Sequence, residues 1–194
     1  MASRETLIFL KAFLRSPGRT GAIAPSSMAL ARAMVRGLSI GAGETVVEFG
    51  PGTGAFTGAI REVLAAPGSY VGFEINPEFV RLVQARFPDL LVVHDSAARA
   101  PEHLARLGRP TVRAIVCGLP FASLPPGTQD EVVGALDRLV LPGAEFRTFQ
   151  YVHAFGLPTA VRFRRRMAAL FGPHQRIATV WPNLPPAFVL RWAR

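Results

Sequence analysis

The richest chemical pattern in the chain is a glycine-rich turn, Glu48-x-Gly50-x-Gly52-x-Gly54, which follows the apolar run 45–50 and precedes a helical stretch. Glycines at a strand-to-helix turn let the backbone bend tightly and approach a bound ligand. The spacing differs from the G-x-G-x-x-G of dinucleotide sites. An acidic residue just before the first glycine is a poor neighbour for a pyrophosphate and suits a ligand with a cationic end. For the glycines alone, a purely structural turn is the alternative.

Two further carboxylates end the next two apolar runs. Glu74 ends the run 70–75, and Asp95 ends the run 90–95. Glu74 is placed to accept hydrogen bonds from two ribose hydroxyls, and Asp95 to accept one from an adenine amino group, with Ile75 against the ring. Each carboxylate alone is more often a solvated residue at a strand end. Together with the glycine turn, they predict a nucleoside-containing ligand in the crevice of an open α/β sheet.

Apolar β-type runs alternate with helical stretches along most of the chain, which is typical of βαβ units and a mostly parallel sheet. The last two runs have no helix between them, which indicates an antiparallel hairpin at one edge. We therefore predict an α/β fold: a doubly wound, mostly parallel, seven-stranded Rossmann-like sheet with a C-terminal hairpin and an N-terminal amphipathic helix. The predicted strands are 45–50, 70–75, 90–95, 112–117, 145–151, 176–181 and 187–192.

The composition narrows the classes of partner. The 194 residues suffice for one domain, and the formal net charge is +9. Such an excess suits a polyanionic partner, either nucleic acid or an anionic membrane, although high arginine usage throughout is an alternative explanation. The only cysteine, Cys117, allows no intramolecular disulfide and no cysteine-based zinc site, so we expect a reducing compartment and no metal. No apolar run approaches the ~20 residues needed to cross a bilayer.

Two basic segments are candidates for contact with a membrane. Residues 4–15 predict a helix with Arg4, Lys11 and Arg15 on one stripe and large apolar residues opposite. The run 162–166 places four arginines around Phe163. Ordinary packing of the first helix against the sheet is the alternative.

Four segments carry a resemblance to known enzymes: 20–27, 48–54, 118–121 and 183–186. They resemble the bacterial phospholipid N-methyltransferases, within the class I S-adenosylmethionine (SAM)-dependent methyltransferases. The resemblance implies one domain over 1–194, comprising a membrane-binding helix (1–19), a covering segment (20–43) and a catalytic core (44–194). It implies SAM as cofactor and S-adenosylhomocysteine as product. Phosphatidylethanolamine and its mono- and dimethyl derivatives would be converted toward phosphatidylcholine.

The same resemblance implies a cytoplasmic enzyme attached peripherally to the cytoplasmic membrane. Its partners would be an anionic membrane surface and the phospholipid substrate, with no nucleic acid and no obligate protein partner. The residues predicted to contact the cofactor are Glu48, Gly50, Gly52, Thr53, Gly54, Glu74, Ile75, Asp95, Ser96, Ala97, Gly118 and Leu119.

The methyl acceptor is expected beside Gly118-Leu119-Pro120-Phe121, after the fourth strand. The rRNA adenine dimethyltransferases, which are similar in sequence, carry Asn at the position of Gly118, where its side chain helps to hold a planar base. Its loss here argues against a flipped base and for a smaller amine. Phe121 would pack on the amine or its methylated cation. Alternatively, Leu-Pro-Phe is a stiff loop filling the core.

Tyr151 and His153, near the end of the fifth strand, are the candidates to orient or deprotonate the amine, although structural roles are the alternative. The resemblance adds Arg19, Thr20 and Ser26 as substrate-binding residues. Rival functions are an rRNA adenine N6-dimethyltransferase-like enzyme, an ornithine-lipid N-methyltransferase, a small-molecule N-methyltransferase and a non-catalytic SAM-binding module.

Overall fold

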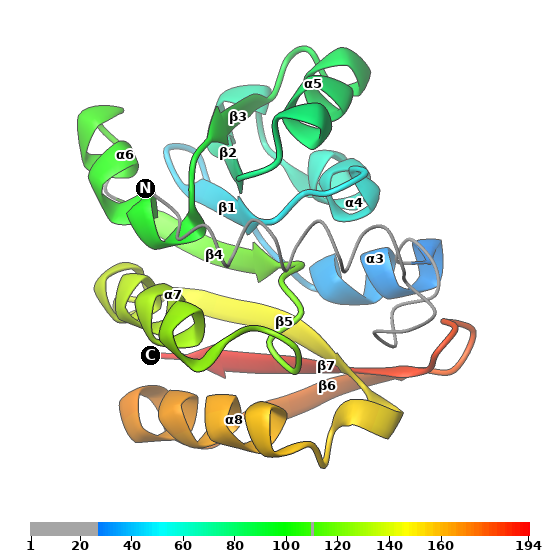
Figure 1. The fold of residues 1–194 in the computed structure, drawn as a ribbon. Helices are drawn as coiled ribbons and strands as arrows, with labels where there is room; N and C mark the ends of the chain where they lie inside the picture. The colour runs from blue at the N-terminus through cyan, green and yellow to red at the C-terminus, as the bar shows by residue number, and fades with distance from the viewer. Residues whose placement is uncertain (1–26, 110) are drawn as a thin grey trace.

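A computed structural model describes residues 27–109 and 111–194 of the chain. The predictions for helix 4–15 and for Arg19, Thr20 and Ser26 lie outside these residues. The centre of the fold is a seven-stranded sheet with the order β3-β2-β1-β4-β5-β7-β6 (Figure 1). The strands are β1 (Thr45–Phe49), β2 (Tyr70–Glu74), β3 (Leu91–His94), β4 (Val112–Cys117), β5 (Glu145–Tyr151), β6 (Gln175–Val180) and β7 (Ala187–Ala193).

Strands β1 to β5 are parallel, and β7 pairs antiparallel with both β5 and β6. Every residue of β1 and β2 is buried, because helices cover both faces of the sheet. Such strands are rich in apolar and β-branched residues along their whole length rather than alternating, as the sequence Thr-Val-Val-Glu-Phe of β1 illustrates. The one charged residue of that strand, Glu48, is therefore an exception that needs partners.

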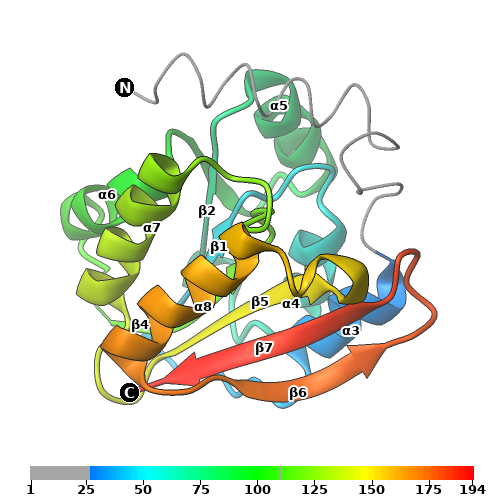
Figure 2. The same ribbon diagram turned by 60° about the horizontal axis from the view of Figure 1, so that its bottom comes forward.

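Six α-helices of the described residues flank the sheet, three on each face (Figure 2). One face carries α3 (Met28–Val35), α4 (Ala55–Val63) and α5 (Pro77–Arg86). The other carries α6 (Ala100–Arg106), α7 (Pro126–Leu139) and α8 (Pro158–Phe171). Three short 3₁₀ turns join these elements: η1 (Pro67–Ser69), η2 (Ala97–Arg99) and η3 (Val152–Ala154).

The predicted fold class is confirmed for the sheet and its C-terminal hairpin, and the strand ends agree with the predicted ones to within one residue. The main local difference follows β3, where α6 is preceded by the separate turn η2. The Ser96 side chain accepts the Ala98 N–H at 3.3 Å and so caps η2, while Pro101 stands in the first turn of α6. This arrangement matters because η2 lies directly after the predicted adenine-binding residues.

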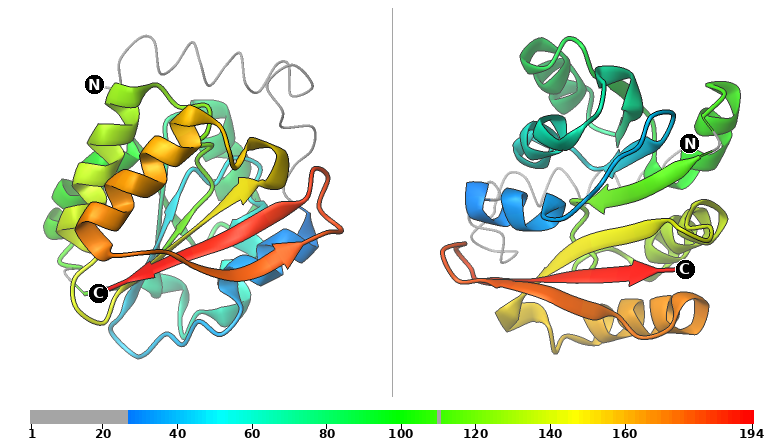
Figure 3. Two further views of the ribbon diagram at one scale, coloured as in Figure 1. Left: turned by 90° about the horizontal axis from the view of Figure 1, so that it is seen from below. Right: turned by 180° about the vertical axis from the view of Figure 1, so that it is seen from behind.

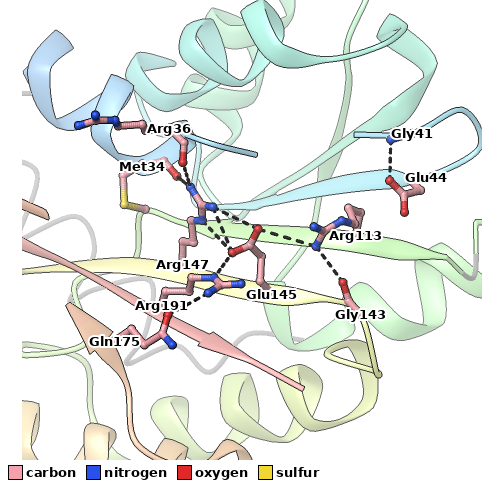
Figure 4. Close-up of polar contacts among 10 residues, drawn as sticks. All are labelled: Met34, Arg36, Gly41, Glu44, Arg113, Gly143, Glu145, Arg147, Gln175 and Arg191. Carbon is pink, nitrogen blue, oxygen red and sulfur yellow. Dashed lines mark hydrogen bonds and ion pairs between the residues drawn. The ribbon is translucent and has the colours of Figure 1, made fainter. Parts of the chain in front are cut away.

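Helix α3 is tied to the C-terminal hairpin at its start and to β5 at its end. At its start, the Ser27 N–H donates to Asn183 Oδ1 at 3.0 Å. At its end, the buried guanidinium of Arg147 donates to the carbonyls of Met34 and Arg36, at 3.1 and 2.7 Å (Figure 4). Glu145, the first residue of β5, accepts hydrogen bonds from the Arg147 guanidinium. A buried ion pair therefore also fixes this end of α3.

Candidate active site at the carboxyl edge of the sheet

The glycine turn after β1 is built from left-handed backbone. Gly50, Gly52 and Gly54 have φ values of 71°, 56° and 85°, which L side chains rarely adopt. A Cβ added to Gly52 would meet nothing within 4 Å, whereas one added to Gly54 would lie 3.1 Å from the ring of Phe87. The turn therefore packs against α5 at its far end and faces open space at Gly52, which fits a cradle for a bound ligand.

Glu48 is fully buried beneath this turn. Its Oε2 accepts hydrogen bonds from Thr57 Oγ1 at 2.8 Å and from the Tyr70 hydroxyl at 2.5 Å. Its Oε1 has no hydrogen-bond partner among the described residues. Burial raises the pKa of Glu48 to about 7, against the opposing effect of the two hydrogen bonds. Contact of Glu48 with a ligand stays a prediction; the observed contacts join α4 and β2 beneath the turn.

The bond from Tyr70 depends on a glycine in the same strand. Gly72 lies opposite Glu48 in the β1–β2 register, and Tyr70 stands two positions earlier on the same face. A Cβ at Gly72 would lie 2.5 Å from the Tyr70 hydroxyl oxygen. Only glycine at this position therefore lets the phenol reach across to the carboxylate.

Glu74 ends β2 and faces the glycine turn. Its Oε2 accepts the Gly52 N–H at 3.1 Å, and its Oε1 accepts the Asn76 N–H at 2.9 Å. Burial raises its pKa, while these backbone donors counteract the rise. Each carboxylate oxygen has more than one lone pair, so both can still accept from the ribose hydroxyls of a nucleoside. Glu74 thus supports the cradle as well as being the predicted ribose ligand.

Asp95 follows β3 and is paired with a histidine. Its Oδ2 lies 2.8 Å from Nε2 of His103, which lies on α6, and its Oδ1 accepts the Ser96 N–H at 2.7 Å. Partial burial raises the pKa of Asp95, but the bonds from His103 and Ser96 outweigh it and lower the pKa. Nearby, His94 Nε2 donates to the Ile75 carbonyl at 3.1 Å, which joins the ends of β2 and β3.

The predicted acceptor segment lies against the glycine turn. The Gly118 N–H donates to the Phe49 carbonyl at 2.8 Å, and the Leu119 side chain packs where a Cβ on Gly50 would lie, 2.8 Å away. A Cβ at Gly118 would lie only 2.7 Å from the Gly50 carbonyl oxygen. Gly118 is thus required by the close approach of two loops, and an asparagine would not fit without moving them apart.

Phe121, which was predicted to contact the acceptor, has its ring in the core of the described structure. The ring is buried and stacks on Phe163 of α8, with ring centroids 3.8 Å apart, and it also meets Phe146 edge-on. Its backbone carbonyl accepts from the buried amide of Gln129 at 2.6 Å. Phe121 is therefore a core residue that fixes the acceptor loop to α7 and α8, because a large aromatic ring gains most from full burial.

Tyr151 and His153 lie together at the end of β5. Their rings stack, with centroids 5.7 Å apart and an interplanar angle of 13°, and Phe149 meets Tyr151 edge-on. Burial raises the pKa of Tyr151, so its phenol stays protonated near neutral pH and can orient an amine but cannot act as a strong base. His153 is exposed at the surface.

Most arginines of the basic run 162–166 already have partners within the protein, so fewer of them are free to contact a membrane than the sequence indicates. Arg162 and Arg166 both pair with Asp130, at 2.7 and 3.3 Å, and Arg164 covers the Phe155 ring at 3.7 Å. Arg165 is exposed. The sequence of this run could not show the Asp130 carboxylate that α7 presents to it.

Three polar residues of this site were missed: His103, Tyr70 and Thr57. Each of them bonds to a carboxylate on another element: His103 to Asp95, and Tyr70 and Thr57 to Glu48. No spacing in the sequence identifies these partners. Thr57 was the easiest of the three to predict from the sequence, because it lies in the first turn of α4, directly after the glycine turn. Within residues 27–109 and 111–194, no group of three or more His, Cys, Asp or Glu side chains is arranged to hold a metal ion.

Comparisons with known proteins found relatives and solved structures of similar fold, although no family model matches the chain. An ornithine lipid N-methyltransferase from Singulisphaera acidiphila is 26% identical over 95% of this chain and 93% of its own length. A ribosomal RNA small subunit methyltransferase A from Burkholderia mallei is 35% identical, but over only 41% of this chain and 30% of its own length.

Among solved structures, a TehB-like SAM-dependent methyltransferase from Corynebacterium glutamicum has a TM-score of 0.63 at 11% identity, covering 97% of this chain and 98% of its own. Aeropyrum pernix fibrillarin, crystallised with bound SAM, has a TM-score of 0.61 at 16% identity, covering 84% of this chain and 74% of its own. With the glycine turn at Gly52, the carboxylates at the next two strand ends and this sheet order, the chain is a SAM-dependent methyltransferase of the class I superfamily.

Proposed function

We propose that this enzyme methylates the amine of a membrane lipid headgroup, with phosphatidylethanolamine and its mono- and dimethyl derivatives as substrates and phosphatidylcholine as final product. The observation that carries the proposal is the packing of Gly118. With its Cβ position only 2.7 Å from the Gly50 carbonyl oxygen, the acceptor loop has no room for the asparagine that would hold a planar base. A small, non-planar amine needs no such side chain.

The comparisons support a lipid amine over a nucleic acid. The relative that matches along nearly its whole length is a lipid N-methyltransferase, whereas the match to the ribosomal RNA methyltransferase spans 30% of that protein. The net charge of +9 suits a membrane surface that contains anionic lipid. Because the full-length relative acts on ornithine lipid, that lipid is the second candidate substrate; its amine is also displayed at a bilayer surface.

The residues of the site divide the work between cofactor and amine. When bound, SAM supplies a methyl group already activated on a sulfonium. Glu74 would accept hydrogen bonds from the ribose, and Asp95 would accept one from the adenine amino group. The backbone at Gly52 would lie against the methionine part of the cofactor. The Tyr151 phenol would orient the amine. An ammonium group must lose a proton before its nitrogen can attack, and the exposed imidazole of His153 can take that proton to solvent.

Attachment to the membrane is part of the proposal. Helix 4–15, as predicted from its sequence, would bury an apolar side while Arg4, Lys11 and Arg15 remain near lipid phosphates. In the part of the chain that the structure describes, no helix is long and apolar enough to span a bilayer. Peripheral attachment is reversible, as suits an enzyme that must move between substrate molecules.

The decisive experiment incubates the full chain with labelled SAM and a panel of acceptors. The panel contains phosphatidylethanolamine liposomes, liposomes with added ornithine lipid, phosphatidylcholine liposomes as a blank, and rRNA fragments. We expect label in phosphatidylethanolamine, with methylated products identified by mass spectrometry. Label only with ornithine lipid would select the second candidate. Label in rRNA and none in lipid would reject both.

A further inference from the structure

The turn between β6 and β7 carries the two most exposed large hydrophobic side chains among the described residues. Leu184 is 74% exposed and Trp181 is 67% exposed. Large apolar side chains held in water are costly, and such a pair on one turn marks a contact surface more often than isolated exposed leucines do. The other tryptophan, Trp192, is 1% exposed in the core.

Hydrogen bonds hold the turn in one conformation, so the exposure of Trp181 and Leu184 is a feature of the folded protein. Between the two apolar tips, the Asn183 side chain points inward and is 2% exposed. Its Oδ1 accepts the Ser27 N–H at 3.0 Å, and its Nδ2 donates to the Pro185 carbonyl at 2.6 Å. One buried amide thus closes the turn and ties it to the start of α3, leaving Trp181 and Leu184 directed outward.

The turn extends beyond the candidate acceptor site. Ala187, the first residue of β7, pairs with both Tyr151 and Val180 in the register. The Val152 N–H, just past Tyr151, donates to the Pro186 carbonyl at 2.9 Å. Figure 3 shows the turn beside the start of α3, on the side where the parallel strands end. The exposed tips therefore lie on the same edge of the sheet as the glycine turn and Tyr151.

The chemistry of the segment suits a lipid surface. Residues 177–190 contain no charged side chain, and arginines stand on both sides, at 176 and 191. Tryptophan prefers the interfacial zone of a bilayer, where its ring is buried and its N–H remains hydrated. Leu157, at the start of α8, is a third exposed apolar residue near this edge, and Arg165 on the same helix adds positive charge.

We propose that Trp181 and Leu184 insert into the interfacial zone of the bilayer that contains the substrate. This inference rests on the proposed lipid methylation and adds a second contact to the one predicted for helix 4–15. With the tips in the bilayer, the carboxyl edge of the sheet faces the headgroups. A lipid amine can then reach Tyr151 without leaving its leaflet.

Intrinsic fluorescence of the full chain provides the test, because Trp192 is buried and Trp181 is not. With vesicles of phosphatidylethanolamine and phosphatidylglycerol, we expect a blue-shifted emission that brominated lipids quench. Trp181→Phe should remove that shift. The double variant Trp181→Ala/Leu184→Ala should lower the vesicle partition coefficient by about tenfold or more. If iodide in the aqueous phase still quenches Trp181 fluorescence when the protein is bound to vesicles, the proposal is overturned.

The matched control is Leu107→Ala/Leu141→Ala, which removes two exposed leucines at the opposite edge of the sheet. Equal loss of vesicle binding in both double variants would reject a specific contact. If the Trp181 double variant changed only the oligomeric state, the turn would be a protein interface and the proposal would fail.

A second readout separates this proposal from the proposed function. Methylation of a short-chain phosphatidylethanolamine, dissolved below its critical micelle concentration, should be unchanged in the Trp181 double variant. Loss of that activity together with loss of SAM affinity would mean that the turn supports the site itself, against the proposal. If no lipid form accepts a methyl group from the wild-type chain, the proposed function fails, whereas the fluorescence result still decides whether the turn enters a bilayer.

Discussion

At the scale of single residues, Glu74 supports the glycine turn and is the predicted ribose ligand. It accepts the Gly52 N–H and is predicted to accept from the ribose hydroxyls. Glu74→Ala should therefore weaken SAM binding by about 1–3 kcal/mol, the range for charged hydrogen bonds. Calorimetry on a folded variant measures this loss. Glu78→Ala, which removes an exposed carboxylate four residues later, is the matched control and should bind SAM like the wild type.

Glu48 gives a pH signature because its pKa in the folded protein is raised from 4.5 to about 7. The folded state then holds a proton more tightly than the unfolded chain does. Stability is fully present below pH 4.5 and falls as the pH rises through 4.5 toward 7. Glu48→Gln carries no such proton, so its stability relative to the wild type should improve by up to about 3 kcal/mol across that window.

Denaturant unfolding of the wild type and of Glu48→Gln at pH 5 and pH 8 tests this expectation. Taking the difference between the two proteins cancels contributions from Glu74 and other titrating groups. A difference that is the same at both pH values would show that Glu48 ionises in the folded protein as it does in water.

Tyr151 and His153 are expected to act on the amine and not on the cofactor. Tyr151→Phe removes the phenol but keeps the ring that stacks on His153. Each of Tyr151→Phe and His153→Ala should lower kcat by about 10²-fold, the lower end for acid–base groups, with SAM affinity within twofold of the wild type. Equal losses in kcat and in SAM affinity would indicate a structural role instead.

At the scale of elements, the close contact between the acceptor loop and the glycine turn sets the shape of the site. Gly118→Ala would place a methyl group 2.7 Å from the Gly50 carbonyl oxygen, and the two loops would have to separate. We expect a destabilisation of about 1–3 kcal/mol, as for other overpacked sites, and weaker SAM binding.

The control for Gly118→Ala lies in the middle of α7. Gly134 has nothing within 4 Å of an added Cβ, so Gly134→Ala should stabilise the protein by about 0.5–1 kcal/mol through helix propensity alone. Thermal unfolding of both variants would therefore show shifts of opposite sign. Equal and small shifts would mean that the loop at Gly118 relaxes freely.

The elements were predictable because their signals are local. Alternating apolar runs and turn residues determined the strands, and the missing helix before β7 indicated the hairpin. The partners of the site residues were not predictable, since they depend on how side chains of different elements meet in the folded protein. His103 reaches Asp95 from α6, and Phe121 turned inward because Phe163 on α8 offers a stacking surface.

At the scale of the whole molecule, the net positive charge would attract the protein to an anionic membrane before any contact forms. Part of the charge on the described surface is neutralised locally, as Asp130 does for two arginines of α8. The segment 1–26, outside the described residues, carries Arg4, Lys11 and Arg15. Its cations should each contribute about 1 kcal/mol to binding at an anionic surface.

The position of this charge can be tested with two triple variants that have the same net charge as each other. Replacing Arg4, Lys11 and Arg15 by Gln should weaken binding to phosphatidylglycerol-containing vesicles by about 10²-fold, which corresponds to the loss of about 3 kcal/mol. SAM affinity should be unchanged, because the glycine turn lies more than thirty positions downstream. Vesicle sedimentation and calorimetry measure the two quantities.

The matched variant replaces Arg106, Arg109 and Arg138 by Gln, near the opposite edge of the sheet, with the same change in net charge. It should bind vesicles nearly as the wild type does, because charges farther from the membrane than the ~10 Å Debye length at 0.1 M salt are screened. Raising the salt should weaken the wild type and leave the Arg4 triple variant much less affected, since its remaining attachment through Trp181 and Leu184 is apolar. If both triple variants lose affinity equally, the charge acts only through its total, and neither the first helix nor the carboxyl edge of the sheet defines the face that meets the membrane.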